Sequence, residues 1–331
     1  MKRLFLIILI AVSAVSCERQ DVYTNVESKL GLLLSLFGQK STPMFVAAGI
    51  SGANGTIWYS SNPDSGAGSW TPASLGISLP AYGITYGKGI YVAVGGTPGN
   101  DNGFICTSSD LTTWTTRNFG GAALQTVCYR SDIGVFCAAG YGSADRVCWS
   151  ADGINWYDAI NTGTNNLWLV SGGSGCFSVM GPAPTCIYSF TGATGTWINS
   201  PQPILDTPYS MTYANGFFLC GTTRVLGGVY RSSNGYDWLP VNGTPDGMGG
   251  IAGGDGVFCG IHSSNTAYFS MDYGATWPVS TSYTPTLWAV AYGGGRFVAG
   301  GTNITVFGVV GNIITSYSIG AVNIYSIAYK P

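Results

Sequence analysis

Charged side chains are scarce in this chain. Its 331 residues include 13 Lys and Arg and 15 Asp and Glu, so charged residues make up 8%, against roughly 25% in an ordinary soluble domain. The formal net charge of −2 provides no basic field for nucleic acid, and we expect no nucleic-acid partner. Glutamate occurs only at Glu18 and Glu27, near the N-terminus.

Histidine and long apolar runs are also nearly missing. His262 is the one histidine, so a histidine-based metal cluster or a Ser-His-Asp triad is hard to assemble, and we expect neither metal nor cofactor. No continuous apolar run reaches the ~18 residues of a membrane-spanning helix. Glycine is abundant, with 50 residues, and aromatic residues make up 13%, which is typical of many short strands joined by tight turns.

Residues 1–16 have the pattern of a secretory signal peptide: a basic start, an apolar run over residues 4–12 and small residues leading into Cys17. This pattern resembles the lipobox of bacterial lipoproteins, in which the cysteine is lipidated and becomes the mature N-terminus, although Ala14 stands where leucine is usual. The resemblance implies a lipid anchor at Cys17 and a location in the bacterial cell envelope, with Glu18 favouring the outer membrane or cell surface. The alternative is ordinary secretion, with an incidental thiol.

One unit recurs seven times after residue 43. It is marked by glycine, an apolar residue and phenylalanine or tyrosine, as in Gly89-Ile90-Tyr91, and by a tryptophan 19 to 25 residues later. The first aromatic positions, spaced 39 to 46 residues apart, are Phe45, Tyr91, Phe136, Phe177, Phe218, Phe258 and Phe297. The second are Trp70, Trp114, Trp156, Trp197, Trp238 and Trp277, with Tyr317 in the seventh place.

A short segment with a small middle residue precedes each glycine motif, as in Ile84-Thr85-Tyr86. Small residues suit the innermost strand of a propeller blade, where strands converge on the axis. We therefore predict an all-β fold, a seven-bladed β-propeller with four antiparallel strands in each blade. The chain enters at a second strand and ends on a first strand near 327–329, so the C-terminal strand should complete the N-terminal blade and close the ring.

Three segments follow from these patterns. They are the signal peptide 1–16, a lipidated N-terminus and tether over 17–42, and the propeller over 43–331. The tether contains an apolar cluster between Leu30 and Phe37, which we expect to pack on the folded domain or to touch the membrane surface.

Polar turns before the tryptophans resemble the Asp box of sialidase-type (BNR) repeats. The full pattern Ser-x-Asp-x-Gly-x-x-Trp occurs at 270–277, and shortened or degraded copies occur in other units. In such a turn, Asp or Asn accepts backbone N–H bonds, glycine supplies positive φ, and tryptophan covers the hairpin. We assign these residues structural rather than catalytic roles: Asp110, Trp114, Asp152, Trp156, Asn234, Trp238, Asp272 and Trp277.

Eight cysteines follow the lipobox. In repeat register, Cys137 and Cys259 alternate with valine, serine and leucine, as small buried side chains do. A disulfide between neighbouring strands, Cys137 with Cys148 or Cys176 with Cys186, stays open. No Cys-x-x-Cys pair occurs, which argues against a zinc site.

One face of the predicted propeller carries connections that vary in length and composition. The turns after the first and third strands are short and alike, whereas the connections after the second and fourth strands differ between units. Variable loops on a uniform scaffold commonly form binding sites. The candidates for a ligand face are the scarce charged residues and aromatic residues near these loops: Asp101, Tyr141, Asp145, Arg146, Trp168, Arg224, His262 and Trp288. Tyr209 adds further aromatic surface near the same loops.

The resemblance to Asp-box proteins covers 43–331 and implies fold more than activity. Its enzymatic members, the sialidases, need an arginine triad and a Tyr/Glu nucleophile pair, and the predicted propeller has no glutamate. We therefore expect a non-catalytic, lipid-anchored propeller that binds a protein or glycan at the cell envelope, in adhesion or as a scaffold. Two alternatives stay open: an Asp-dependent glycosidase or lyase using Asp145, Asp158 or Asp206, and an assembly factor for an envelope complex.

Overall fold

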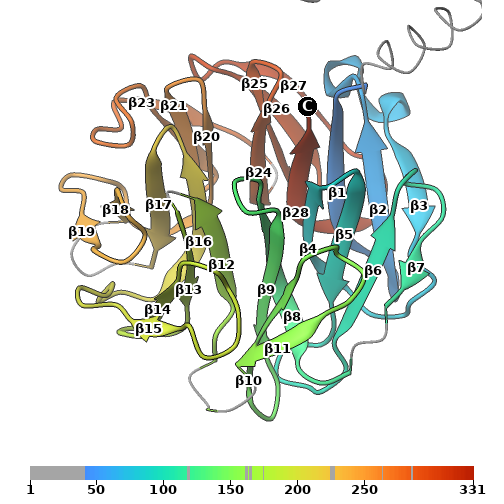
Figure 1. Ribbon diagram of the computed structural model, residues 1–331. Coiled ribbons are helices and arrows are strands. Elements are labelled where there is room, and N and C mark those ends of the chain that lie inside the picture. Colours follow the sequence, from blue (N-terminus) through green and yellow to red (C-terminus); the bar gives the residue numbers. More distant parts are fainter. Residues whose placement is uncertain are drawn as a thin grey trace, which may run out of the picture. The chain divides into compact units, whose positions relative to one another are not determined.

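Seven four-stranded antiparallel sheets form a ring in the computed structural model (Figure 1). The prediction of an all-β, seven-bladed propeller is therefore confirmed. The structure describes residues 42–117, 120–160, 163, 166–173, 175–223, 228–262, 264–284 and 286–331. The predicted signal peptide and Cys17 lie outside these residues. Within the described ranges, no helix is long and apolar enough to cross a membrane.

Each blade runs from an inner strand at the axis to an outer strand, and we number the blades in chain order from the one that contains β1. The inner strands are β28 (Val322–Lys330), β4 (Ala81–Gly87), β8 (Ala123–Arg130), β12 (Leu169–Gly173), β16 (Pro208–Ala214), β20 (Met248–Gly254) and β24 (Leu287–Gly293). The second strands are β1 (Met44–Ser51), β5 (Ile90–Gly95), β9 (Val135–Tyr141), β13 (Cys176–Met180), β17 (Phe217–Thr222), β21 (Val257–His262) and β25 (Arg296–Gly301). The third strands are β2 (Asn54–Ser60), β6 (Phe104–Ser108), β10 (Asp145–Ser150), β14 (Cys186–Ser189), β18 (Val229–Ser232), β22 (Thr266–Ser270) and β26 (Ile304–Gly308). The outer strands are β3 (Thr71–Ser74), β7 (Thr115–Thr116), β11 (Tyr157–Ile160), β15 (Ile198–Asn199), β19 (Leu239–Pro240), β23 (Val279–Ser282) and β27 (Ile313–Tyr317).

In blades 2, 5, 6 and 7, the inner hairpin turns on two residues in the left-handed region. Asn215 and Gly216 have φ of 53° and 85°, and Asp255 and Gly256 have φ of 50° and 84°. Two positive φ values in succession define a type I′ turn, whose twist matches that of the flanking strands. In these blades, the recurring glycine of the sequence motif is therefore the second turn residue.

The hydrophobic core lies between blades. Seven clusters of buried residues each join two neighbouring sheets. One of them packs Val46 and Ile57 of blade 1 against Ile84 and Ala93 of blade 2. Each sheet buries both faces in this way, and charged side chains are almost never fully buried unless paired. This burial explains the low charge of the repeats.

Glycines on the inner strands make room for tyrosines of the next blade. A β-carbon on Gly87 would overlap the ring of Tyr129, and one on Gly254 would overlap the ring of Tyr292. The same tyrosines also pack on the second strand of their own blade, as in the Tyr292–Phe297 pair, whose ring centroids lie 4.9 Å apart. Glycine and tyrosine therefore set the spacing between blades.

The polar turn before Trp156 is held by side-chain acceptors. Ser150 Oγ accepts the N–H of Gly153 at 2.8 Å, and Asp152 Oδ1 accepts the N–H groups of Ile154 and Asn155, both at 2.8 Å. The indole of Trp156 donates to the Gly153 carbonyl at 2.9 Å. Every one of these bonds stays within the turn, so the carboxylate satisfies backbone donors.

The same geometry recurs in the other blades. Asp110, Asn234 and Asp272 each accept two backbone N–H bonds in their turns, and the indoles of Trp114 and Trp238 donate to carbonyls. The remaining turn residue of the predicted set, Trp277, is buried. In blade 4, where the turn has no acidic residue, the Ser189 hydroxyl accepts two N–H bonds and the Thr191 hydroxyl accepts one. Serine is thus the more constant element of these turns.

The ring is closed by pairing β28 with β1, from Met44 opposite Lys330 to Ser51 opposite Val322. Figure 1 shows the last strand, in red, beside the first strand, in blue. Ser326 Oγ also accepts the N–H of Ile84 at 3.3 Å, which ties blade 1 to blade 2. The predicted closure is confirmed.

Removal of residues 324–331 should abolish cooperative unfolding, because it strips most of the inner strand from blade 1 and exposes the edge of β1. Calorimetry of the truncated and full chains measures this. Leu239→Ser, at a side chain 59% exposed on an outer strand, serves as the control and should change stability by less than ~0.5 kcal/mol. An unchanged melting curve for the truncated chain would contradict the closure.

Acid should weaken the turn at Asp152. Burial opposes ionisation of this carboxyl, but the N–H bonds from Asn155 and Ile154 outweigh it and lower the pKa to about 2. A lowered folded-state pKa contributes stability above the unfolded value of ~3.9, and that contribution is lost as pH falls toward ~2. Asp152→Asn reproduces the residue that blade 5 has at Asn234 and should reduce the loss of melting temperature between neutral and acid pH. Equal losses in the two proteins would refute this assignment.

Candidate functional site

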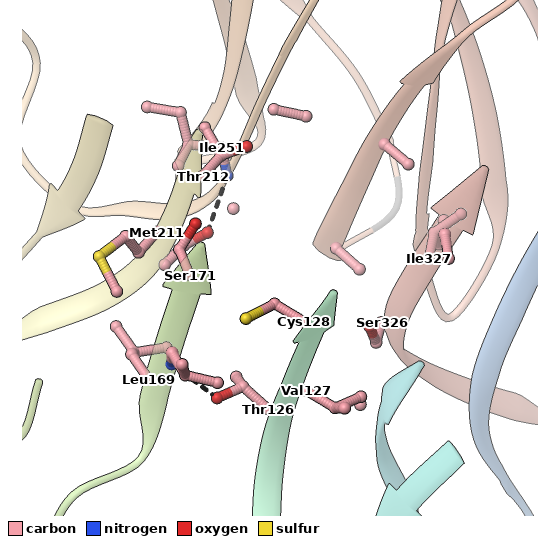
Figure 2. A pocket seen from close by; sticks show the side chains of 18 of the residues that line it. Thr126, Val127, Cys128, Leu169, Ser171, Met211, Thr212, Ile251, Ser326 and Ile327 are labelled. Atoms are coloured by element: carbon pink, nitrogen blue, oxygen red, sulfur yellow. Dashed lines mark hydrogen bonds between the residues drawn. The ribbon is translucent and has the colours of Figure 1, made fainter. Parts of the chain in front are cut away.

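A cavity of about 780 Å³ lies where the seven inner strands converge. Every inner strand contributes to its wall. Figure 2 shows Thr126 and Cys128 of β8 beside Leu169 and Ser171 of β12 on this wall. Its volume is within the ~300–1,000 Å³ that small-molecule sites usually enclose, so this cavity is the candidate site.

A β-bulge near the start of the inner strand occurs in six blades, and it places one residue outside the ladder. In blade 4 the equivalent residue, Trp168, directly precedes β12, and its backbone N–H donates to the Met180 carbonyl at 3.0 Å. Bulges commonly re-aim a side chain, and here all seven residues line the cavity at its variable-loop end. We call them the mouth ring; in blade order they are Tyr325, Tyr82, Gln125, Trp168, Tyr209, Gly249 and Trp288.

Aromatic side chains of the mouth ring form two arcs. In the first, Tyr325 packs on Tyr82 with ring centroids 4.7 Å apart and on Trp288 at 5.9 Å, with planes 25° apart. The second contains Trp168, which lies 6.2 Å from Tyr141 of β9, and Tyr209 of the next blade. Trp288 is 38% exposed and Tyr209 is 53% exposed, so both arcs present large apolar surface to solvent.

Gln125 and Gly249 separate the two arcs. The side-chain Nε2 of Gln125 is buried and has no hydrogen-bond partner among the residues the structure describes. A buried donor without a partner costs about 1–3 kcal/mol, and the fold bears that cost at this junction of the ring. At the other junction, a β-carbon on Gly249 would meet only the Ile261 carbonyl, at 3.9 Å.

The part of the cavity wall that the structure describes is uncharged. Among the described residues that line it there is no Asp, Glu, Lys, Arg or His. Burial raises the pKa of Tyr82, and the neighbouring Tyr325 and Tyr141 raise it further. The Tyr82 hydroxyl therefore stays protonated at neutral pH and can both donate and accept hydrogen bonds.

The charged candidates Asp101, Asp145 and Arg146 do not line this cavity. Asp101 accepts the N–H of Ser143 at 3.0 Å, and hydrogen bonding from the side chain of Ser143, together with this backbone bond, lowers the pKa of Asp101. Asp145 is 1% exposed and accepts the Leu167 N–H at 3.2 Å. Arg146 donates to Asp158 at 2.8 Å and to the carbonyl of Gly120. These contacts hold the loops of blades 2 and 3 in place.

His262 also lies outside the cavity wall. Its Nε2 is 3.4 Å from Asp246 Oδ1, and its Nδ1 is 2.7 Å from Ser264 Oγ. Arg224 lies outside the described residues, so the structure neither supports nor opposes its place in the predicted set.

The structure thus brings together three of the eight predicted ligand-face residues, Tyr141, Trp168 and Trp288. The sequence-based site contained Trp168, Tyr209 and Trp288 of the mouth ring, and it lacked the other four members: Tyr82, Gln125, Gly249 and Tyr325. Their common signal is a fixed place two residues before the small-residue segment of each repeat.

The eight cysteines of the described propeller are free, so neither candidate pair forms a disulfide. All are buried except Cys128, which is half-buried on the cavity wall. Burial raises the pKa of the Cys128 thiol, more than Arg130 lowers it. The thiol is therefore protonated at neutral pH and is a poor nucleophile.

Comparisons with known proteins identify the fold alone. No family model and no curated protein matches the chain. Its structure is similar to the computationally designed Ika8 protein, with 10% identity, a TM-score of 0.61 and coverage of 88% of this chain and 92% of that chain. The WD40 β-propeller domain of Doa1 has 13% identity, a TM-score of 0.57 and coverage of 76% and 86%. A chain of the nidogen/laminin complex has 9% identity, a TM-score of 0.50 and coverage of 87% and 98%.

Thiol titration tests the cysteine assignment. In a Cys17→Ser protein unfolded without reductant, we expect all eight propeller cysteines to react with Ellman's reagent, and almost none to react in the folded state, because burial holds them protonated. A lower count after unfolding would mean that a disulfide is present.

Proposed function

We propose that this chain is a non-catalytic binding protein of the bacterial cell envelope, anchored by lipid at Cys17. It engages a protein or glycan partner through the propeller face that bears the mouth ring. The observation that carries the binding role is the set of partly exposed aromatic side chains around an open cavity, because contiguous exposed apolar surface commonly marks an interaction site. The anchor rests on the lipobox pattern before Cys17.

The positions of the carboxylates support binding rather than hydrolysis. A glycosidase typically uses two carboxyl groups that flank the scissile bond, and the candidates Asp145, Asp158 and Asp206 are absent from the described cavity wall. Asp206 is 3% exposed and accepts the hydroxyl of Tyr230 at 3.3 Å. Burial, together with the Asp206 charge, raises the pKa of Tyr230 to about 12, so this hydroxyl remains a donor to the carboxylate.

The polar turns support a relationship to Asp-box propellers without their enzymatic activity. The Ser, Asp and Trp side chains of these turns bond within the turn itself. The similar chain from the nidogen/laminin complex gives a precedent for this fold within a protein complex. The chain would then keep the scaffold of the repeats and use the opposite face for recognition.

Photo-crosslinking in cells tests the binding face. Benzoylphenylalanine replaces Tyr209, 53% exposed in the mouth ring, or Tyr273, 49% exposed in a polar turn on the opposite face. We expect crosslinked adducts from position 209 alone, because the partner occupies the mouth. Adducts from position 273 alone would contradict the choice of face, and adducts from neither would contradict a binding role.

Two further measurements complete this test. Cys17→Ala should move the protein from the detergent phase to the aqueous phase in Triton X-114 partition, because the lipid anchor is lost. Turnover of fluorogenic glycosides by the wild-type protein, lost in Asp206→Asn, would favour the enzymatic alternative.

A further inference from the structure

Large aromatic faces and uncharged hydrogen-bonding groups occur together in the mouth ring. Five of its seven residues are tyrosine or tryptophan, and a sixth, Gln125, has a buried amide nitrogen with no partner among the described residues. Deeper on the wall lie the hydroxyl-bearing residues Thr85, Ser171 and Thr212. A sugar unit presents apolar C–H faces and a rim of hydroxyls, so it can pack on aromatic rings and bond to amides and hydroxyls at once.

The absence of charge narrows the choice of ligand. The described cavity wall has no basic or acidic side chain, and a charged ligand would lose hydration there without finding a counter-charge. Acidic sugars and charged peptides are therefore disfavoured. A neutral ligand that carries many hydroxyls has no such penalty.

The order of residues around the mouth ring indicates how an extended ligand would lie across it. Trp288, Tyr325 and Tyr82 come from three consecutive blades, and Trp168 and Tyr209 come from two blades across the axis. Between the arcs, Gln125 closes one junction, while Gly249 leaves the other without a side chain. A chain lying between the arcs can thus leave the mouth over blade 6.

We propose that the mouth ring is a binding site for a neutral carbohydrate chain. The sugar rings stack between the two aromatic arcs, Gln125 closes the site at one end, and the chain leaves past Gly249. This inference rests on the proposed binding function and specifies the ligand class of the same face.

Gly249 offers a test in which a side chain is added. Its φ is outside the left-handed region, and the nearest atom to an added β-carbon is 3.9 Å away, so a side chain can be added without a clash at its β-carbon. The equivalent position of blade 7 carries Trp288. Gly249→Trp should fill the opening and block the ligand, whereas Gly249→Ala should leave it open. Tyr209→Ala and Trp288→Ala remove one stacking surface from each arc.

The assay measures binding of the full-length protein in detergent micelles by calorimetry. The probes are neutral hexasaccharides of glucose, galactose, mannose and xylose, with hexagalacturonate and sialyllactose as charged counterparts. We expect at least one neutral probe to bind, and Gly249→Trp, Tyr209→Ala and Trp288→Ala each to weaken it by about 10-fold or more. Gly249→Ala should bind as the wild type does. So should Tyr157→Ala, which removes an aromatic side chain 55% exposed on the outer strand β11.

Three results would overturn the inference: no neutral probe binds, a charged probe binds more tightly, or binding survives all three mouth variants when their melting curves match the wild type. If crosslinking from position 209 still traps a protein in such a case, the binding face stands and only the carbohydrate assignment fails. If no neutral probe binds and no crosslinked adduct forms from position 209, the proposed binding function is wrong as well.

Discussion

Closure of the ring by β28 and β1 is the pairing on which the rest of the structure depends. Seven sheets bury both faces against each other, so a missing or displaced blade would expose two apolar surfaces at once. The same closure forces seven inner strands toward one axis, where only small or well-spaced side chains fit. Glycines such as Gly87, which lies against Tyr129, meet that requirement.

The mouth ring is a product of the same repetition. A bulge at one place in the repeat gives equivalent positions around the axis, and the ladder hydrogen bonds do not restrict which side chain stands there. The scaffold can therefore carry tyrosine, tryptophan, glutamine or glycine at these positions without loss of the fold. In the binding role that we propose, fold and recognition are thus separated, since the mouth-ring residue of each blade faces the ligand while most of the inner strand packs against neighbouring strands.

The sequence predicted the fold far better than the site. The seven-bladed architecture was predicted from seven aromatic positions with a near-constant spacing, each followed by a tryptophan or, in the last unit, by Tyr317. The closure was predicted from the entry at Phe45 and the end near Tyr329. A bulge is decided by the register of two strands, so the sequence around Tyr325 or Tyr82 does not reveal it. The charged residues were predicted to face a ligand because they are rare in this chain. The structure instead pairs Arg146 with Asp158, which lies on the next strand of the same blade, and this ion pair lies outside the cavity wall.

Fluorine NMR tests the claim that this uncharged aromatic mouth is the recognition site. Protein labelled with 5-fluorotryptophan should show ten resonances, one for each tryptophan, and Trp168→Phe and Trp288→Phe assign the two at the mouth. Addition of a neutral hexasaccharide that binds should shift those two resonances and leave those of the turn tryptophans, such as Trp156 and Trp238, in place. Shifts confined to the turn tryptophans would contradict the account.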